Sequence, residues 1–286
     1  MTEKSSKIKG RHYKAQVTLK AIVLLFYAVI VIFPFFWILS TSFKGSQGEI
    51  YAFPVEYWSK HPSWINYESI LVKGKFGLYF LNSLFTSTLA ALVAVIIGIM
   101  SGYVIARFQF RFRKLVLFLF LFTQMVPAFM LLAPQYQMMS KLHLINTRWV
   151  LVLAYTNMMI PFCTVTLRGF FAGIPRELEE AAMVDGCGRI QSLIHVVLPV
   201  MLPGISSTFI FAFINSWNEL FSAVMFIDVD KYRTIPVALN ALILKYDIEW
   251  GEMSAGIVIS IIPTMILFAF SQKYIAEGLT AGAVKG

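Results

Sequence analysis

The chain has 286 residues, of which 58% are hydrophobic and only 14% carry a charge. Soluble domains average about 25% charged residues, so this composition excludes an ordinary water-soluble protein. A net charge of +9 would suit nucleic acid if the basic residues formed one patch. They are spread between apolar runs instead, so no nucleic-acid partner is expected.

Long apolar runs divide the chain into six expected membrane spans. A bilayer core needs roughly 20 consecutive apolar residues in a helix. Runs of about that length lie at 21–43, 76–106, 115–140, 149–167, 190–218 and 253–272. With both termini in the cytoplasm, 15 Lys and Arg residues lie inside and nine outside, and only this orientation obeys the positive-inside rule. The sequence therefore predicts an all-α, polytopic membrane protein with a cytoplasmic tail at 1–16 and a transmembrane domain at 17–286.

Prolines and glycines in the first half of the chain predict departures from straight, isolated helices. Those in the outer loop after the first span argue against a long helix there. Gly98 and Gly102 lie four residues apart in the second span, where they allow close approach of a helix from this chain or from another subunit. Pro127 and Pro134 each remove a backbone donor from the third span, so we expect a kink.

Three polar residues interrupt the fifth apolar run. Asn215, Asn218 and Glu219 follow helical i, i+3, i+4 spacing and share one face. A charge near the bilayer centre costs roughly 2.5–3.5 kcal/mol, so this face needs water or a polar partner. Two interpretations remain open, a solute path and a polar contact between helices.

Residues 168–199 form the longest expected cytoplasmic segment. Pro175 suits the first turn of a helix, and a positive φ at Gly186 would end that helix. Gly188 would begin a second short helix. The acids Glu177, Glu179 and Glu180 would be stabilised by the first helix dipole, while an apolar ridge is expected at Leu178, Ala181 and Ala182. Composition alone also fits an ordinary amphipathic interfacial loop.

The same segment resembles the EAA loop of ABC-transporter permeases. That pattern is Glu-Ala-Ala, three residues, Gly, nine residues, an aliphatic residue, one residue and Leu-Pro. The chain matches it at Glu180, Ala181, Ala182, Gly186, Val196, Leu198 and Pro199. Asp185 is typical of the carbohydrate branch, and stretches 106–111, 217–219, 233–237 and 278–286 also resemble that branch. The chain is therefore identified as similar to the second, shorter permease subunit of maltose-type importers.

The resemblance implies the type I ABC importer permease fold with six transmembrane helices. It also implies a multi-pass subunit of a bacterial inner-membrane importer for sugars, above all an oligosaccharide, that forms half of the translocation path. By the same resemblance, Glu180, Ala181, Ala182, Asp185 and Gly186 would contact the ATPase.

The implied partners are a second homologous permease, two ATPase subunits, membrane lipid and an extracytoplasmic solute-binding protein facing residues 228–250. The chain has no G-x-x-x-x-G-K-[ST] motif, so ATP and Mg²⁺ would bind the partner subunits. No catalytic residue, cofactor or metal site is expected in this chain.

Three other functions are alternatives to sugar import. The first is another ABC import branch, carrying glycerol phosphate, peptides, amino acids or polyamines. The second is an intramembrane enzyme, but the sequence has no H-E-x-x-H or G-x-S-x-G motif. The third is a scaffold without transport, against which the coupling segment and the span prolines argue.

Overall fold

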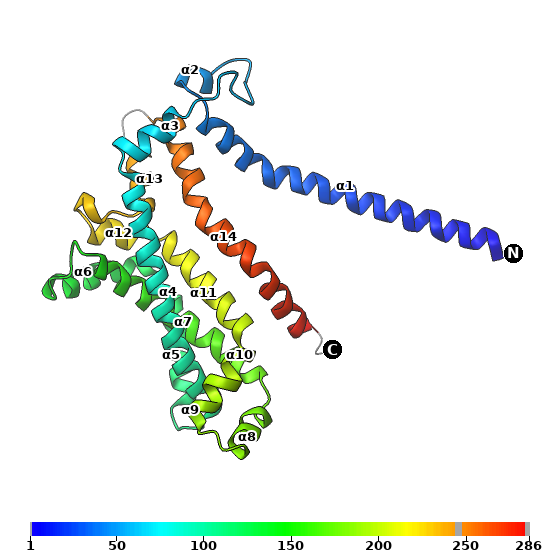
Figure 1. Ribbon diagram of the computed structural model, residues 1–286, viewed down its shortest axis with the longest axis vertical. Coiled ribbons are helices and arrows are strands. Elements are labelled where there is room, and N and C mark those ends of the chain that lie inside the picture. The colour runs from blue at the N-terminus through cyan, green and yellow to red at the C-terminus, as the bar shows by residue number, and fades with distance from the viewer. Residues whose placement is uncertain (1, 244–247, 284–286) are drawn as a thin grey trace. The chain divides into compact units, whose positions relative to one another are not determined.

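The structure is a computed structural model that describes the backbone of residues 2–243 and 248–283 and the side chains of 16–243 and 248–270. Within these residues every regular element is a helix, as predicted (Figure 1). Four helices are long and apolar enough to cross a membrane, and two bent helix pairs bring the number to six if each pair is one span. Most of the expected tail and the stretch 278–286 lie outside the described side chains, so the domain boundary stays a prediction.

The chain divides into two compact units, residues 1–74 with 246–259 and residues 75–245 with 260–286. The first unit begins with α1 (Thr2–Ser42). Within its span, Gln16–Ser42, the most apolar stretch of 18 residues has no buried residue, whereas Ser40, Thr41 and Ser42 at the end of the span are buried. A helix that is apolar all round suits a lipid or subunit environment.

An outer loop encloses the end of α1 within the first unit. It contains the helices α2 (Gln47–Ile50) and α3 (Ile65–Glu68) and the π-helix η1 (Ser69–Lys73), and the expected absence of a long helix is confirmed within the described loop. The side-chain nitrogen of Asn66 donates to the carbonyl oxygens of Ser42 and Lys44, at 3.0 and 2.8 Å. These bonds bring the loop back over the helix end.

Among the described side chains of this unit, Lys44 is the most deeply buried charge, with 1% of its surface exposed. Its Nζ donates to the carbonyl oxygen of Glu56 at 2.8 Å and lies 5.0 Å from the ring centre of Trp37. A buried amine needs such partners, because an unpaired buried charge is costly.

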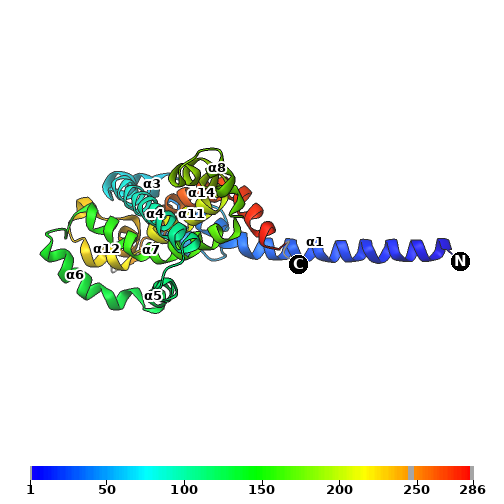
Figure 2. The same cartoon turned by 90° about the horizontal axis from the view of Figure 1, so that it is seen from below.

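The second unit is built around α4 (Phe76–Arg107) and α7 (Arg148–Gly173), with α11 (Leu202–Trp217) packed on both (Figures 1 and 2). A Cβ added at Gly98 would lie 2.8 Å from the Cβ of Cys163, and one at Gly102 would lie 2.9 Å from the amide nitrogen of Arg168. The two glycines therefore allow a helix of the same chain to approach closely, which is the first of the two possibilities that the sequence left open.

The third span is broken. The helix α5 (Arg113–Met125) and the pair η2 (Ala128–Leu131) and α6 (Leu132–Lys141) meet at 97°. Pro127 lies in the break, which confirms the expected kink. Pro134 instead lies in the first turn of α6, where its missing N–H has no helical acceptor to lose.

The fifth span is also bent. Residues 189–200 meet α11 at 76°, near Pro199 and Pro203. After α11 the chain forms α12 (Phe221–Phe226), η4 (Asp230–Tyr232) and α13 (Ile235–Ile243). The last helix, α14 (Trp250–Ala283), is divided between the two units.

Candidate functional site

The candidate coupling segment begins with α8 (Glu177–Val184). Its first turn holds Glu177, Glu179 and Glu180, as expected from the helix dipole. Pro175 lies just before the helix rather than in its first turn, a boundary difference of one or two residues. The element that the sequence predicted is therefore present.

A glycine turn ends α8. The amide of Cys187 donates to the carbonyl oxygen of Ala182 at 3.0 Å, and the amide of Gly186 donates to that of Met183 at 3.1 Å. Gly186 has φ +91°, and together these features form a Schellman motif. The predicted geometry of two short helices around Gly186 is confirmed.

A second short helix follows the turn. The amide of Gly188 donates to Oε1 of Gln191 at 2.8 Å at the start of α9 (Arg189–Ser192). The π-helix η3 (Leu193–Val197) and α10 (Leu198–Val200) continue to the bend, and α8 contacts both α9 and η3. The whole segment is therefore packed on itself as a compact module.

A buried ion pair ties this module to the end of α4. Arg107 Nε lies 2.5 Å from Glu179 Oε1, and the exposed fractions of the two side chains are 8% and 10%. Tyr103 also donates its hydroxyl to Glu179 Oε2 at 3.0 Å, and Arg107 donates to the carbonyl oxygen of Ile174 at 3.1 Å. Arg107 thus connects the helix to the connection before α8 as well as to α8 itself.

The sequence alone does not predict this pair, because Arg107 lies in the stretch 106–111 and Glu179 in a segment far along the chain. In the sequence Glu179 looks like one of three equivalent acids in the first turn of α8. Its i+3 neighbour Ala182 is also buried, so one face of α8 points into the protein. The spacing of Glu179 and Ala182 was the available signal.

The predicted coupling residues fall into two groups. Glu180, Ala181, Asp185 and Gly186 are exposed on the module. Ala182 differs from the expectation that it shares an outward ridge with Leu178 and Ala181, because it is buried. The exposed apolar surface comes instead from Leu178, Met183, Val184 and Ile190.

A basic groove borders the ion pair. It has a volume of about 240 Å³ and is lined in part by Arg107, Arg176 and Arg189 together with Glu179 and Glu180. The guanidinium of Arg189 lies 5.0 Å from the ring centre of Phe108. The groove gives the module a polar edge beside its apolar surface.

The three polar residues of the fifth span do not line this module. Asn215 and Asn218 donate to the carbonyl oxygens of Phe211 and Ile214, at 2.8 and 2.9 Å, on their own helix. Both carboxylate oxygens of Glu219 accept from the amide of Ser222, at 3.0 and 3.1 Å, and so cap α12. Their role in a solute path stays a prediction.

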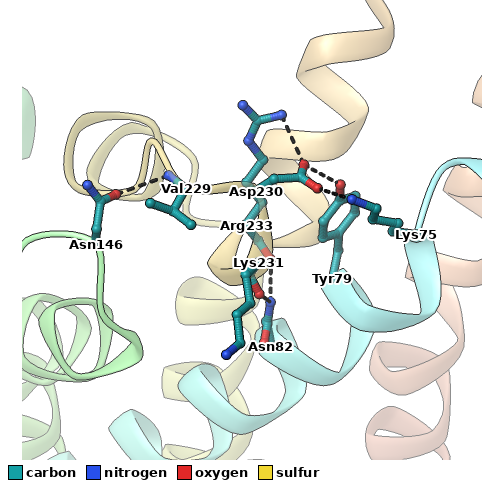
Figure 3. A network of polar contacts seen from close by, with 8 residues as sticks. All are labelled: Lys75, Tyr79, Asn82, Asn146, Val229, Asp230, Lys231 and Arg233. Carbon is teal, nitrogen blue, oxygen red and sulfur yellow. Dashed lines mark hydrogen bonds and ion pairs between the residues drawn. The ribbon is translucent and has the colours of Figure 1, made fainter.

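A second polar network fixes the loop between α12 and α13 on the expected outer side (Figure 3). Asp230 Oδ1 accepts from the hydroxyl of Tyr79 at 2.6 Å, and its Oδ2 accepts from Lys75 Nζ at 2.8 Å. These donors hold the pKa of Asp230 below its ordinary value. The carboxylate therefore stays charged and anchors the loop to the first turns of α4.

Backbone groups complete the same network. Asn82 donates to the carbonyl oxygens of Lys231 and Arg233, both at 2.9 Å, and Asn146 Oδ1 accepts from the amide of Val229 at 3.1 Å (Figure 3). The part of the predicted 228–250 surface from 228 to 234 is thus held by α4 and by the loop before α7. Residues 244–247 of that surface lie outside the described residues.

The described residues contain no group of three His, Cys, Asp or Glu side chains that could hold a metal ion. Cys163 is buried and Cys187 is half-buried, and both are free thiols. Neither one lies in a constellation with evident chemistry of its own.

The exposed helix–glycine–helix module lies in a helical chain whose described residues include four to six candidate membrane spans, an arrangement that fits a membrane subunit of a transport system. The family model described as "Binding-protein-dependent transport system inner membrane component" matches residues 94–280. The chain belongs to this family.

Individual relatives agree over most of the length. The sulfoquinovosyl glycerol transport system permease protein SmoH of Agrobacterium fabrum is 35% identical, covering 89% of each chain. The diacetylchitobiose uptake system permease protein DasC of Streptomyces coelicolor is 34% identical, covering 90% of this chain and 92% of the relative. A crystal structure of a bacterial ABC transporter that imports the acidic polysaccharide alginate has a similar fold, with TM-score 0.78, 22% identity and coverage of 96% and 99%.

Proposed function

We propose that this chain is a permease subunit of an ATP-driven sugar importer. It forms half of the translocation path and couples to a separate ATPase through the module at 168–199. The observation that carries the proposal is the exposed α8–Gly186–α9 module, held to α4 by the buried Arg107–Glu179 pair. Relatives named for sugar-containing solutes support a sugar cargo over glycerol phosphate, peptide, amino acid or polyamine import.

The module transmits motion because it is attached to two membrane helices. Tyr103 and Arg107 hold α8 to the inner end of α4, and the chain leading into α8 comes directly from α7. These two helices form the packed centre of the second unit. A push on the exposed surface of α8 therefore moves the α4–α7 pair rather than a loose loop.

The remaining partners follow from this role. A second homologous permease supplies the other half of the path, and two ATPase subunits bind ATP and Mg²⁺ in the cytoplasm. An extracytoplasmic binding protein delivers the solute to the surface that includes residues 228–234. The chain itself hydrolyses nothing, and it lies in the bacterial inner membrane, surrounded by lipid, with both termini in the cytoplasm.

Purification of the tagged chain from native membranes in mild detergent tests this function. We expect a second permease, an ATPase and a binding protein to co-purify, and the reconstituted complex to import a sugar only with ATP. The ligand released from the binding protein, identified by mass spectrometry, names the cargo class. Recovery of the chain alone, under conditions that preserve a known transporter from the same membranes, would contradict the proposal.

A further inference from the structure

We propose that a cavity at the break of the third span is a contact site for a neutral saccharide; this inference rests on the proposed sugar-import function. The cavity has a volume of about 490 Å³ and lies where the break meets α7, α11 and α12. Its lining includes Gln124, Gln135, Asn157, Phe162, Phe211 and Ser222. This volume falls within the range of about 300–1,000 Å³ that is usual for small-molecule sites.

The cavity lies deep in the expected membrane region. Asn157 is nine residues from the start of α7, which at 1.5 Å per residue places it about 14 Å along the helix. A bilayer core is about 30 Å thick, so this residue lies near its middle. A solute crossing the membrane has to pass this depth.

Two carboxamides in the lining have no partner within the described part of the chain. The side chains of Gln135 and Asn157 make no hydrogen bond to the described residues, and Gln124 makes only a long one, 3.4 Å, to the carbonyl oxygen of Phe120. An amide left unpaired in hydrocarbon is costly, whereas one facing a water-filled path is not. Each amide also offers two donor hydrogens and an acceptor oxygen, which match the paired hydroxyls of a sugar.

An aromatic wall lies beside these amides. The rings of Phe162 and Phe211 are stacked, with centroids 4.1 Å apart and an angle of 25° between their planes. Stacked rings present a flat apolar surface, and the C–H faces of a pyranose ring pack on such surfaces. Amides that bind hydroxyls and rings that bind C–H faces together favour a saccharide over a purely apolar or a compact polar solute.

The lining that this chain contributes favours an uncharged solute. None of the described residues that line this cavity is Asp, Glu, Lys, Arg or His, and the carboxylate of Glu219 behind Ser222 is engaged by the amide of that residue. A carboxylate, phosphate or ammonium held at this depth would need an opposite charge, because burial of an unpaired ion is costly. The site therefore accepts a neutral saccharide, in contrast to the acidic polysaccharide of the alginate transporter that shares the fold.

The charge of the cargo is tested with the complete transporter, purified through this chain with its partners and reconstituted in proteoliposomes. The probes are neutral trimers of glucose, xylose and N-acetylglucosamine and matched trimers of galacturonate and mannuronate. We expect ATP-dependent uptake of a neutral trimer and none of the uronate trimers. Uptake of uronate trimers alone would overturn the inference and leave sugar import intact. Uptake of neither kind, with a non-sugar ligand released from the binding protein, would overturn the proposed function as well.

The site itself is tested by the variants Asn157→Leu and Gln135→Leu. We expect each to lower sugar uptake at limiting solute by about three- to tenfold, which corresponds to one lost hydrogen bond. ATP hydrolysis stimulated by the binding protein should persist, because the coupling module is untouched. The matched control is Gln137→Leu, an exposed residue of α6 outside the cavity lining.

Uptake equal to wild type in both cavity variants would overturn the site. If a leucine variant fails to assemble with its partners, Asn157→Thr and Gln135→Thr shorten the side chains while keeping them polar, and the same uptake loss is expected. Asn157→Gln, which retains the amide, should keep more activity than Asn157→Leu.

Discussion

The carboxylate of Glu179 lies 2.5 Å from Nε of Arg107, and both side chains are nine-tenths or more buried. One belongs to the cytoplasmic end of a membrane helix and the other to the short helix that carries the family motif. The pair therefore joins α8, which would meet the ATPase, to α4, which forms the packed centre of the second unit with α7.

Breaking this pair should uncouple the transporter. Arg107→Met leaves a buried, unpaired carboxylate, which costs about 3–5 kcal/mol. We expect a lower melting temperature and more ATP hydrolysed per sugar imported. Glu177→Gln, an exposed acid on the same turn, is the control and should match wild type. The double variant Arg107→Met with Glu179→Leu removes both charges and should recover most of the stability. Wild-type coupling in Arg107→Met would show that the pair is dispensable.

The glycine turn makes a paired prediction. Gly186 has φ +91°, so Gly186→Ala should cost about 1–2 kcal/mol, although the space around it is open. Gly186→Pro should abolish ATPase docking, because it also removes the amide that donates to Met183. Gly188 has φ −67°, so Gly188→Ala is the matched control and should be neutral. Co-purification of the ATPase with each variant measures the effect. Normal docking in Gly186→Pro would contradict the coupling role.

Substitution of Glu219 separates its two interpretations. Both its carboxylate oxygens accept from the amide of Ser222, so Glu219→Leu should weaken the start of α12 by about 1 kcal/mol and reduce uptake. Glu219→Gln keeps an acceptor oxygen without the charge, and we expect it to retain most uptake. Equal loss in both variants would instead favour a charge requirement in the solute path. Uptake assays in proteoliposomes distinguish these outcomes.

Close packing of α4 and α7 predicts sensitivity to single methyl groups. A Cβ at Gly98 would lie 2.8 Å from Cys163, so Gly98→Ala should cost about 1–3 kcal/mol through overpacking. Gly77, on the same helix, has nothing within 4 Å of an added Cβ, and Gly77→Ala should be neutral. Thermal unfolding in detergent compares the two. Similar melting temperatures for both variants would show that α4 and α7 shift to accommodate the added methyl group at little cost.

The network around Asp230 predicts that stimulation by the binding protein changes little with pH near neutrality. The pKa of Asp230 lies below its ordinary value of 3.8, because Lys75 and Tyr79 donate to its carboxylate. A lowered pKa means that the network contributes stability above pH 3.8 and loses it only as the pH falls through the folded-state pKa. Stimulation by the binding protein should therefore change little from about pH 5 to 8 on account of this group. Asp230→Asn should weaken that stimulation throughout this range, and an effect confined to acid pH would contradict this prediction.

Local signals in the sequence predicted most of the helices and the turn. The break at Pro127 and the turn at Gly186 follow from backbone chemistry that one residue dictates. Pro134 and Pro127 both lack a backbone N–H, but only Pro127 lies at a break. The position of a proline within its helix decides whether the lost N–H matters. Sequence could not place that helix start.

Contacts between distant residues were beyond the same reasoning. Glu179 and Arg107 are 72 positions apart, and their pairing depends on how α4 ends beside α8. The saccharide cavity draws its lining from five α-helices, α5, α6, α7, α11 and α12, and from the break between the first two of them. Polarity within one span pointed to Asn215, Asn218 and Glu219, whose hydrogen bonds are local. Amides without local partners become visible only after the helices are packed.

The buried Lys44 has a consequence for how the protein is inserted during synthesis. A lysine drawn into the bilayer centre costs roughly 2.5–3.5 kcal/mol, so it marks a limit to the depth of the first helix. Its amine is held by the carbonyl oxygen of Glu56, 12 residues later in the chain. The finished position of the helix end therefore depends on that stretch lying outside the membrane and folding back over it. Extra apolar residues added within α1 should shift its inner end and leave its outer end in place.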